Sequence, residues 1–432
     1  MFTYYLDLAR RSLGRNVGLT VLMIVAIAFG VGASMTTLTV LHVLSADPIP
    51  GKSHQLYYVQ LDPRRALGYT PGSQPLEQMP LADAELLLRA GKADRQVIMT
   101  GGEAAIEPQR AGLAPFFVDG RWTSAEFFAM FGVPFVTGGP WTADDDARRA
   151  HVAVIARSLA DKVFGSVAVV GRTIRVEGTE LRITGVIDTW QVSPHFYDLN
   201  TARYGGSELV FVPFETSRDL KLHRSGNMNC WDEAPDPEAV GAPCEWIQVW
   251  VELDSPDKAA AYRDFLIRYS EDQLHAGRFQ RPPNVRLSDV MAWLEHNHVV
   301  PSDARLQTWI ALGFLLVCLV NTVGLLLTKF LRRSAEIGVR RALGASKRSI
   351  FIQLLVEAGM IGLVGGAIGL GLAWLGLWAV RHQPTDYAQL AQLDLPMLAG
   401  TFALSILASL CAGLLPAWRG CQVTPAIQLK SH

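Results

Sequence analysis

The sequence lacks several motifs that mark common catalytic sites. It has no GxxxxGK[ST] run, so these residues cannot hold the phosphates of ATP in a P-loop. It also has no GxSxG and no CxxC, the signatures of α/β-hydrolase nucleophiles and of many redox or zinc sites. We therefore expect a chain that is not an enzyme, with no catalytic residue and no cofactor of its own.

Candidate metal ligands are also few. His296 and His298 are two residues apart, a spacing that does not place two side chains on one helix face. The run of Asp144, Asp145 and Asp146 lacks the spaced ligands and the glycine of a calcium loop. It fits better at the start of a surface helix capped by Thr142. We expect no metal site.

Charge is scarce. Only 18% of the 432 residues are charged and 50% are hydrophobic. The mean hydropathy of +0.20 is too apolar for an ordinary soluble protein and too polar for a membrane bundle without a large aqueous part. A net charge of -1 gives no basic surface for nucleic acid, which we exclude as a partner. The length allows two or three domains.

The few charges leave four long apolar runs, each able to cross about 30 Å of hydrocarbon. We assign membrane spans to residues 17–44, 305–328, 350–380 and 397–418. A cleaved signal peptide ending near Ala46 is an alternative for the first run, but that run is too long for a typical signal. The segments between and beside the spans are a terminal helix (1–16), a large domain (45–304), a basic loop (329–349), a short outer loop (381–396) and a tail (419–432).

Basic residues set the orientation. Arg10, Arg11 and Arg15 precede the first span, in an amphipathic segment typical of a membrane surface. The loop of residues 329–349 carries a basic excess, which marks the cytoplasmic side. Both termini are then cytoplasmic, and residues 45–304 lie outside the inner membrane, in the periplasm. Membrane lipid is thus one expected partner.

The large domain has the pattern of an α+β fold. Short alternating runs predict strands, and runs with helical spacing predict helices. Residues 191–244, rich in glycine, asparagine and proline, predict a long, variable insertion. The predicted strands are 55–61, 114–118, 151–155, 173–176, 181–187, 209–212 and 247–253, and the predicted helices are 81–89, 158–164 and 259–269. The expected fold is therefore a four-helix membrane domain with a large α+β periplasmic domain inserted between its first two spans.

Cys230 and Cys244 lie in the polar middle of the chain. In an oxidising compartment they are expected to form a disulfide, and two buried thiols are the alternative. In the third apolar run, Gly362/Gly366 and Gly365/Gly369 form two GxxxG pairs, which allow close helix approach. Such glycines can pack helices within one subunit or between two subunits.

The basic loop itself predicts a short helix over residues 335–343. Glu336 precedes Arg340 by four residues, which favours an ion pair on one helix face. Gly344 is a natural helix stop and Ser346 can cap the next helix. Glu357 lies near the inner end of the third run, where an acid either has a functional role or pairs with an arginine of the loop. The basic charges alone are also explained if the loop is only a positive-inside anchor.

The loop also carries a specific string. Residues 336–345, EIGVRRALGA, followed by Gln353, Glu357 and Ala358, resemble the FtsX/MacB permease family of ABC transporters. Looser similarity to MacB-like periplasmic domains runs from residue 117 to residue 187. The resemblance implies that residues 335–343 are a coupling helix that docks on an ATPase. Its site residues would be Glu336, Ile337, Gly338, Arg340, Arg341, Leu343 and Gly344, with Arg340 and Arg341 meeting acids and Ile337 and Leu343 filling an apolar pocket.

The resemblance implies a split-type permease that acts by mechanotransmission. A separate ATPase subunit would bind ATP and magnesium, and a second, identical or different permease would complete the transporter. Periplasmic motion would then extrude a peptide, toxin, antibiotic or lipid-like substrate, with a membrane-fusion adaptor and an outer-membrane channel as further partners. The alternatives are FtsX-like signalling to a cell-wall hydrolase and lipoprotein release of the LolC/LolE kind.

Overall fold

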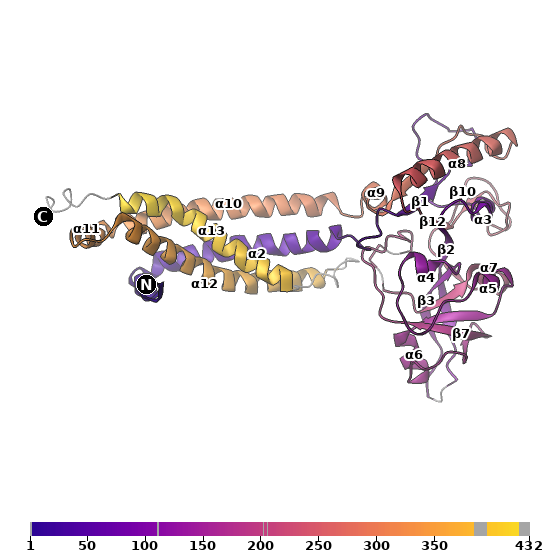
Figure 1. Cartoon of the computed structure of the whole chain (residues 1–432), viewed down its shortest axis with the longest axis horizontal. Coiled ribbons are helices and arrows are strands. Elements are labelled where there is room, and N and C mark those ends of the chain that lie inside the picture. Colours follow the sequence, from indigo (N-terminus) through magenta and orange to yellow (C-terminus); the bar gives the residue numbers. More distant parts are fainter. Residues whose placement is uncertain (1, 110–111, 202, 205, 384–394, 423–432) are drawn as a thin grey trace. The chain divides into compact units, whose positions relative to one another are not determined.

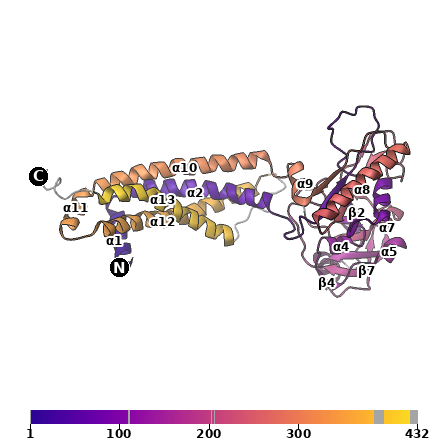
Figure 2. The ribbon, with the colours of Figure 1, turned by 45° about the horizontal axis from the view of Figure 1, so that its top comes forward.

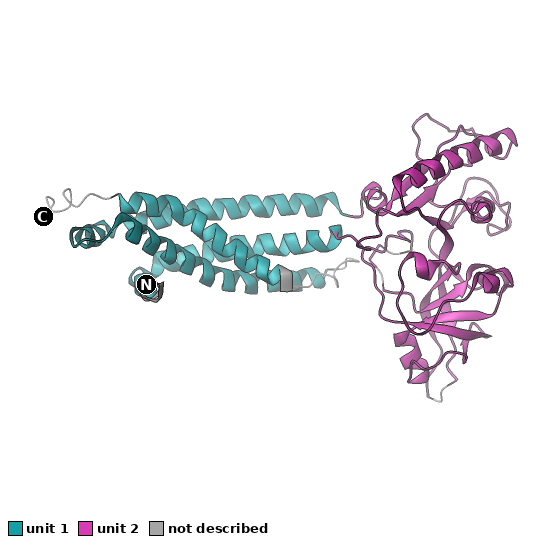
Figure 3. Ribbon diagram, viewed as in Figure 1, with its two compact units in different colours: residues 1–45, 300–432 teal, residues 46–299 magenta. Residues whose placement is uncertain are grey.

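The computed structural model describes the whole chain except residues 1, 110–111, 202, 205, 384–394 and 423–432. The chain forms two compact units (Figure 3). Unit 1 comprises residues 1–45 and 300–432, and unit 2 comprises residues 46–299.

Unit 1 is a helix bundle (Figures 1 and 2). Within the described residues, four of its helices are long and apolar enough to cross a membrane, as the sequence predicts. Two shorter helices, α1 and α11, lie at the same end of this bundle in both views. The helices are α1 (Phe2–Arg15), α2 (Val17–Ser45), α10 (Ser302–Leu331), α11 (Ser334–Ala342), α12 (Lys347–Arg381) and α13 (Leu395–Cys421).

Glycines bring the helices of unit 1 close together. A Cβ atom on Gly362 or Gly366 would overlap a serine side chain of α13. A Cβ atom on Gly365 or Gly369 would lie 2.9 or 3.1 Å from the nearest atom of α2. Both GxxxG pairs of α12 therefore pack against helices of the same chain, the first of the two uses that the sequence allows.

Unit 2 is built on a mixed sheet. Within the described residues it has eleven strands, with the main order β13-β1-β12-β2-β3-β8-β5-β7-β4. The strands are β1 (Leu56–Gln60), β2 (Arg95–Ile106), β3 (Phe116–Thr123), β4 (Phe135–Gly138), β5 (Val152–Ala156), β6 (Thr173–Val176), β7 (Thr179–Ile187), β8 (Val210–Pro213), β9 (Arg224–Ser225), β12 (Gln248–Glu252) and β13 (Arg286–Asp289). A separate hairpin joins β10 (Asn229–Cys230) to β11 (Cys244–Glu245).

Helices cover both faces of this sheet. They are α3 (Leu81–Ala90), α4 (Phe127–Met130), α5 (Ala143–Ala147), α6 (Arg157–Phe164), α7 (Phe214–Asp219), α8 (Pro256–His275) and α9 (Val290–His296). The start of α5 agrees with the prediction, because the Thr142 hydroxyl accepts a hydrogen bond from the backbone N–H of Asp145 in a capping box.

Strand β2 connects the two hydrophobic cores of unit 2. Successive residues of a strand point to opposite faces, so Val97 and Met99 enter one core and Ile98 enters the other. The same strand pairs with β12, β3, β6 and β9. The sequence pattern does not predict this strand, because its glycines and central polar residues break the simple alternation.

Part of residues 191–244, the segment predicted as a long, variable insertion, is packed into the core of unit 2. Phe196 and Tyr197 are buried in a hydrophobic core. Asp198 and Glu208 accept hydrogen bonds from the buried guanidinium of Arg121, at 2.6 Å to Asp198 Oδ2 and 2.5 Å to Glu208 Oε1. Partners so distant in sequence leave no local pattern, so the segment's glycines and prolines dominate what the sequence shows.

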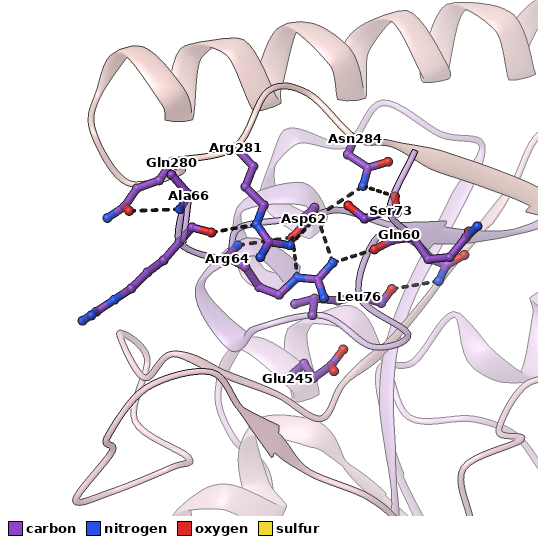
Figure 4. A network of polar contacts seen from close by, with 12 residues as sticks. Gln60, Asp62, Arg64, Ala66, Ser73, Leu76, Glu245, Gln280, Arg281 and Asn284 are labelled. Atoms are coloured by element: carbon purple, nitrogen blue, oxygen red, sulfur yellow. Dashed lines mark hydrogen bonds and ion pairs between the residues drawn. The ribbon is translucent and has the colours of Figure 1, made fainter. Parts of the chain in front are cut away.

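A second polar network fixes the loop after β1 (Figure 4). The Asp62 carboxylate accepts hydrogen bonds from Arg64 at 2.6 Å, Arg281 at 3.1 Å and Asn284 at 3.2 Å. Burial alone would raise the pKa of Asp62, but these hydrogen bonds and the Arg64 charge outweigh it and hold the pKa below its ordinary value. The carboxylate thus ties this loop to the segment before β13.

Cys230 and Cys244 form a disulfide across the β10–β11 hairpin, as expected for an oxidising compartment. The two cysteines are 14 residues apart. A loop of about this length contributes about 3 kcal/mol by restricting the unfolded chain. We expect Cys230→Ser/Cys244→Ser to lower the thermal midpoint of unit 2, measured by tryptophan fluorescence. Cys411→Ser, which removes an exposed thiol from α13, is the control and is expected to leave that midpoint unchanged.

Candidate functional site

The candidate site is the end of the bundle that carries α11. This helix spans Ser334–Ala342, one residue earlier than predicted at each end. Gly344 follows with a φ of 98°, a left-handed conformation that favours glycine. The Ser346 hydroxyl then accepts a hydrogen bond from the backbone N–H of Ser349 and caps α12, as predicted. A sharp turn between two capped helices therefore presents α11 as a separate element.

The two sides of α11 differ. Ile337 and Gly338 are buried, and Ile337 belongs to the hydrophobic core of the bundle. Val339 is 57% exposed and Leu343 is 83% exposed. The expectation that Ile337 fills a pocket of another protein is therefore wrong, because that side chain faces its own bundle. The exposed apolar residues of this helix end are Val339 and Leu343.

Glu336 is the centre of the charged side of α11. Its carboxylate lies 2.8 Å from Arg340, 3.2 Å from Arg15 and 3.3 Å from Arg333. The pair with Arg340 was predicted, and Arg15 adds the end of α1. Partial burial would raise the pKa of Glu336, but the hydrogen bond and charge of Arg333, with the charges of Arg340 and Arg15, lower it. Glu336 is thus held as an anion between three arginines.

Glu357 is the centre of a second, deeper cluster. It is almost fully buried, and its carboxylate lies 2.7 Å from the Lys329 ammonium group and 3.1 Å from the Arg333 guanidinium. The Ser12 hydroxyl donates a hydrogen bond to the same carboxylate at 2.5 Å. Pairing with an arginine of the loop is confirmed. Lys329, also fully buried, is a partner that the sequence analysis missed.

Arg333 connects the two clusters. It contacts Glu336 in α11 and Glu357 in α12, and it donates a hydrogen bond to Ser12 at 2.5 Å. Arg340 adds a second link from α11 to α12 through a hydrogen bond to Gln353 at 3.1 Å. We call these residues the bracket: Ser12, Arg15, Lys329, Arg333, Glu336, Arg340, Gln353 and Glu357. Through the bracket α1, the end of α10, α11 and α12 are held by charge-assisted hydrogen bonds.

Only some contacts of the bracket can be predicted from the sequence. Partners three or four residues apart on one helix, such as Glu336 and Arg340, follow from helical spacing. Ser12 and Arg15 are more than 300 residues away from their partners, and no local signal points to them. The position of Lys329 does indicate an acidic partner, because a lysine in the last turn of an apolar span requires a counter-charge when it is buried.

Two family models match this sequence. The MacB-like periplasmic core domain matches residues 20–268, and the FtsX-like permease C-terminal domain matches residues 309–425. The first match alone covers more than half of the chain. The chain belongs to the MacB/FtsX-like permease family of ABC transporters. The string of residues 336–345 and the bracket residues from Lys329 to Glu357 fall inside the FtsX-like region, whereas Ser12 and Arg15 precede both matched regions.

The curated relatives that match this chain share low sequence identity with it. The chain is 26% identical over 384 residues to the pyoverdine export ATP-binding/permease protein PvdT of Pseudomonas entomophila, covering 87% of this chain and 49% of that protein. It is 25% identical to the macrolide export protein MacB of Azoarcus sp., covering 69% of this chain and 40% of that protein. It therefore spans about half the length of the curated relatives that it matches.

Among solved structures, the chain matches the periplasmic region of MacB from Actinobacillus actinomycetemcomitans. The sequences are 12% identical and the TM-score is 0.37. The match covers 58% of this chain and 96% of the solved one.

Proposed function

We propose that this chain is the permease subunit of an ABC transporter that works by mechanotransmission. A separate ATPase subunit binds α11, hydrolyses ATP with Mg²⁺ in its own site, and moves this helix. The motion passes into the membrane helices and then to the periplasmic domain inserted between α2 and α10. The result is extrusion of a substrate from the periplasmic side. The relatives named for pyoverdine and macrolide export support export over signalling or lipoprotein release.

The observation that carries this proposal is the division of α11 into a held side and a free apolar end. The bracket ties Glu336 and Arg340 to the bundle, so a force on α11 acts on α10 and α12. Val339 and Leu343, which are exposed, provide apolar contacts for a partner. A helix that only anchored the chain by charge would need neither feature.

The remaining parts of the proposal follow from charge and family. The basic excess around α11 supports an inner-membrane topology in which this loop and both termini are cytoplasmic and residues 46–299 are periplasmic. A second permease chain, identical or different, completes the membrane part. We further propose a membrane-fusion adaptor and an outer-membrane channel as partners, because a substrate extruded from the periplasm needs a path across the outer membrane.

The proposal is tested by co-purification from detergent-solubilised membranes. Wild type is expected to retain a chain with a P-loop ATPase motif, identified and quantified by mass spectrometry. Val339→Asp/Leu343→Asp is expected to lower its amount at least about tenfold, because each burial of a charge at the contact costs more than about 1.4 kcal/mol. Both residues are exposed, so the bundle itself is expected to remain folded.

The matched control is Leu67→Asp, which places the same charge on an exposed leucine of unit 2. It is expected to retain the ATPase at the wild-type level. Retention of the ATPase by the α11 double variant would show that docking uses another surface. Absence of any ATPase from wild-type complexes that still hold a second permease would contradict the transporter proposal itself.

A further inference from the structure

A narrow groove runs between α12 and α13 on the surface of the bundle. Its volume is about 250 Å³. Every lining residue is apolar, so nothing in the groove can pair with a polar ligand. The lining residues are Ile352, Leu355, Val356, Gly359, Met360, Leu363, Ile406 and Leu410.

Gly359 keeps this groove open. A Cβ atom at Gly359 would meet only Leu410 Cδ2, at an ordinary contact distance of 3.7 Å. By contrast, a Cβ atom on Gly362, one turn further along α12, would overlap Ser409. Gly362 is thus required for packing α12 against α13, whereas Gly359 leaves space that a side chain could occupy. A larger residue at position 359 would fill the groove without pushing the two helices apart.

The length of the groove matches one leaflet of a bilayer. On α12 the lining runs from Ile352 to Leu363 at helical spacing. Eleven residues at a rise of about 1.5 Å give about 16 Å. This is close to half of the hydrocarbon thickness of about 30 Å. The groove therefore covers the leaflet on the α11 side of the membrane.

The end of the groove nearest α11 is basic and bears an aromatic residue. Arg348 precedes Ile352 by four residues, so it continues the same face of α12, and it is exposed. It also lies in the first turn of α12, where the helix dipole favours an anion. Trp418 follows Leu410 by eight residues on α13 and is 56% exposed, as tryptophans are at membrane interfaces.

We propose that this groove binds one acyl chain of an anionic phospholipid, with the lipid phosphate at Arg348. The apolar lining, the leaflet-long groove and the cation at one end fit a single lipid molecule of that leaflet. This site goes beyond the proposed transport function and does not depend on it. The bound chain fills the gap between α12 and α13 next to Val356, the neighbour of Glu357 in the bracket. Lipid occupancy therefore supports the part of α12 that the bracket joins to α11.

The test is native mass spectrometry of the full-length permease in mild detergent, titrated with palmitoyl-oleoyl phosphatidylglycerol or phosphatidylcholine. Wild type is expected to retain one tightly bound phosphatidylglycerol per chain, with affinity about fivefold higher than for phosphatidylcholine, because one basic residue near a lipid surface contributes about 1 kcal/mol. Arg348→Gln is expected to bind both lipids equally. Gly359→Leu is expected to lose the tightly bound lipid of either kind.

Gly371→Leu is the matched control. Gly371 is an exposed glycine of the same helix, and a Cβ atom there meets nothing within 4 Å. This variant is expected to retain lipid like wild type. Equal lipid retention by Gly359→Leu and Gly371→Leu would overturn the proposal. Conversion of a dimer to monomers by Gly359→Leu, with lipid retention unchanged, would also overturn it, because the groove would then be covered by a second copy of the chain.

Discussion

Glu357→Gln is expected to destabilise the helix bundle by about 3 to 5 kcal/mol, the usual cost of removing one partner from a buried ion pair. The variant leaves the Lys329 ammonium group fully buried without its counter-charge, at the position where it now lies 2.7 Å from the carboxylate. Thermal unfolding of the detergent-solubilised chain, followed by tryptophan fluorescence, measures the loss. Under the proposed function, the same variant is also expected to uncouple the partner's ATP hydrolysis from transport, because Arg333 loses its ion pair with α12.

A second substitution, Lys329→Met, distinguishes the effect of an unpaired buried cation from simple misfolding. In the Glu357→Gln background it removes the unpaired cation, so the double variant is expected to be more stable than Glu357→Gln alone. Additive destabilisation by the two substitutions would contradict the pairing. Under the proposed function, coupling is expected to remain impaired in the double variant, since stability is restored without the ion pair between Arg333 and α12.

Arg121→Met is expected to have a comparable effect on unit 2. Arg121 is buried, and it is the main cation facing the buried carboxylates of Asp198 and Glu208. The remaining partners of Glu208 are the Tyr197 hydroxyl at 2.8 Å and His195 at 3.3 Å. Two buried acids without their arginine cost about 3 to 5 kcal/mol at neutral pH. The unfolding midpoint of unit 2 in the full chain measures this cost.

The stability difference between wild type and Arg121→Met is expected to depend on pH in a defined direction. In wild type, burial would raise the pKa of Glu208, but the charges of Arg121 and His195 outweigh it and hold the pKa well below its ordinary value. The stability that Glu208 contributes is therefore present above its ordinary pKa and lost only in strong acid. Without Arg121, burial dominates and raises the pKa of Glu208 in the folded protein. The free energy of unfolding of the variant therefore falls as pH rises from the ordinary pKa of a glutamate through this raised pKa.

Wild type and Arg121→Met are thus expected to differ more at neutral pH than near about pH 4 to 5, and least in strong acid, where wild type also loses the stability that Glu208 contributes. Arg121→Lys, which keeps one charge but not the two-sided contact, is expected to lie between them. A constant difference across this pH range would mean that the loss comes from packing rather than from unpaired carboxylates.

The sequence predicts the elements of this protein better than it predicts their contacts. The four apolar helices, the helix around Glu336, its stop at Gly344 and the cap at Ser346 each depend on residues close in the chain, and all were predicted. The bracket depends on contacts between α1 and the region from Lys329 to Glu357, and only its local pairs could be predicted. Burial of Ile337 was also missed, because a helix of nine residues does not reveal which apolar side chain faces the bundle.

Unit 2 follows the same rule. Its short alternating strands were predicted from period-two patterns, as in β6 and β7. The buried segment around Asp198 was predicted as an insertion, because its polar residues are satisfied by Arg121 on a distant strand. A polar residue is predicted to lie at the surface unless its buried partner is also known.

The position of β2 limits how this protein can be engineered. One strand of 12 residues supplies side chains to both cores and backbone hydrogen bonds to both halves of the sheet. Neither half can keep its fold when β2 is removed or replaced by a strand with a different pattern. A chimaera that exchanges this unit with that of a relative must therefore move residues 46–299 as one block, and partial swaps are expected to yield insoluble protein.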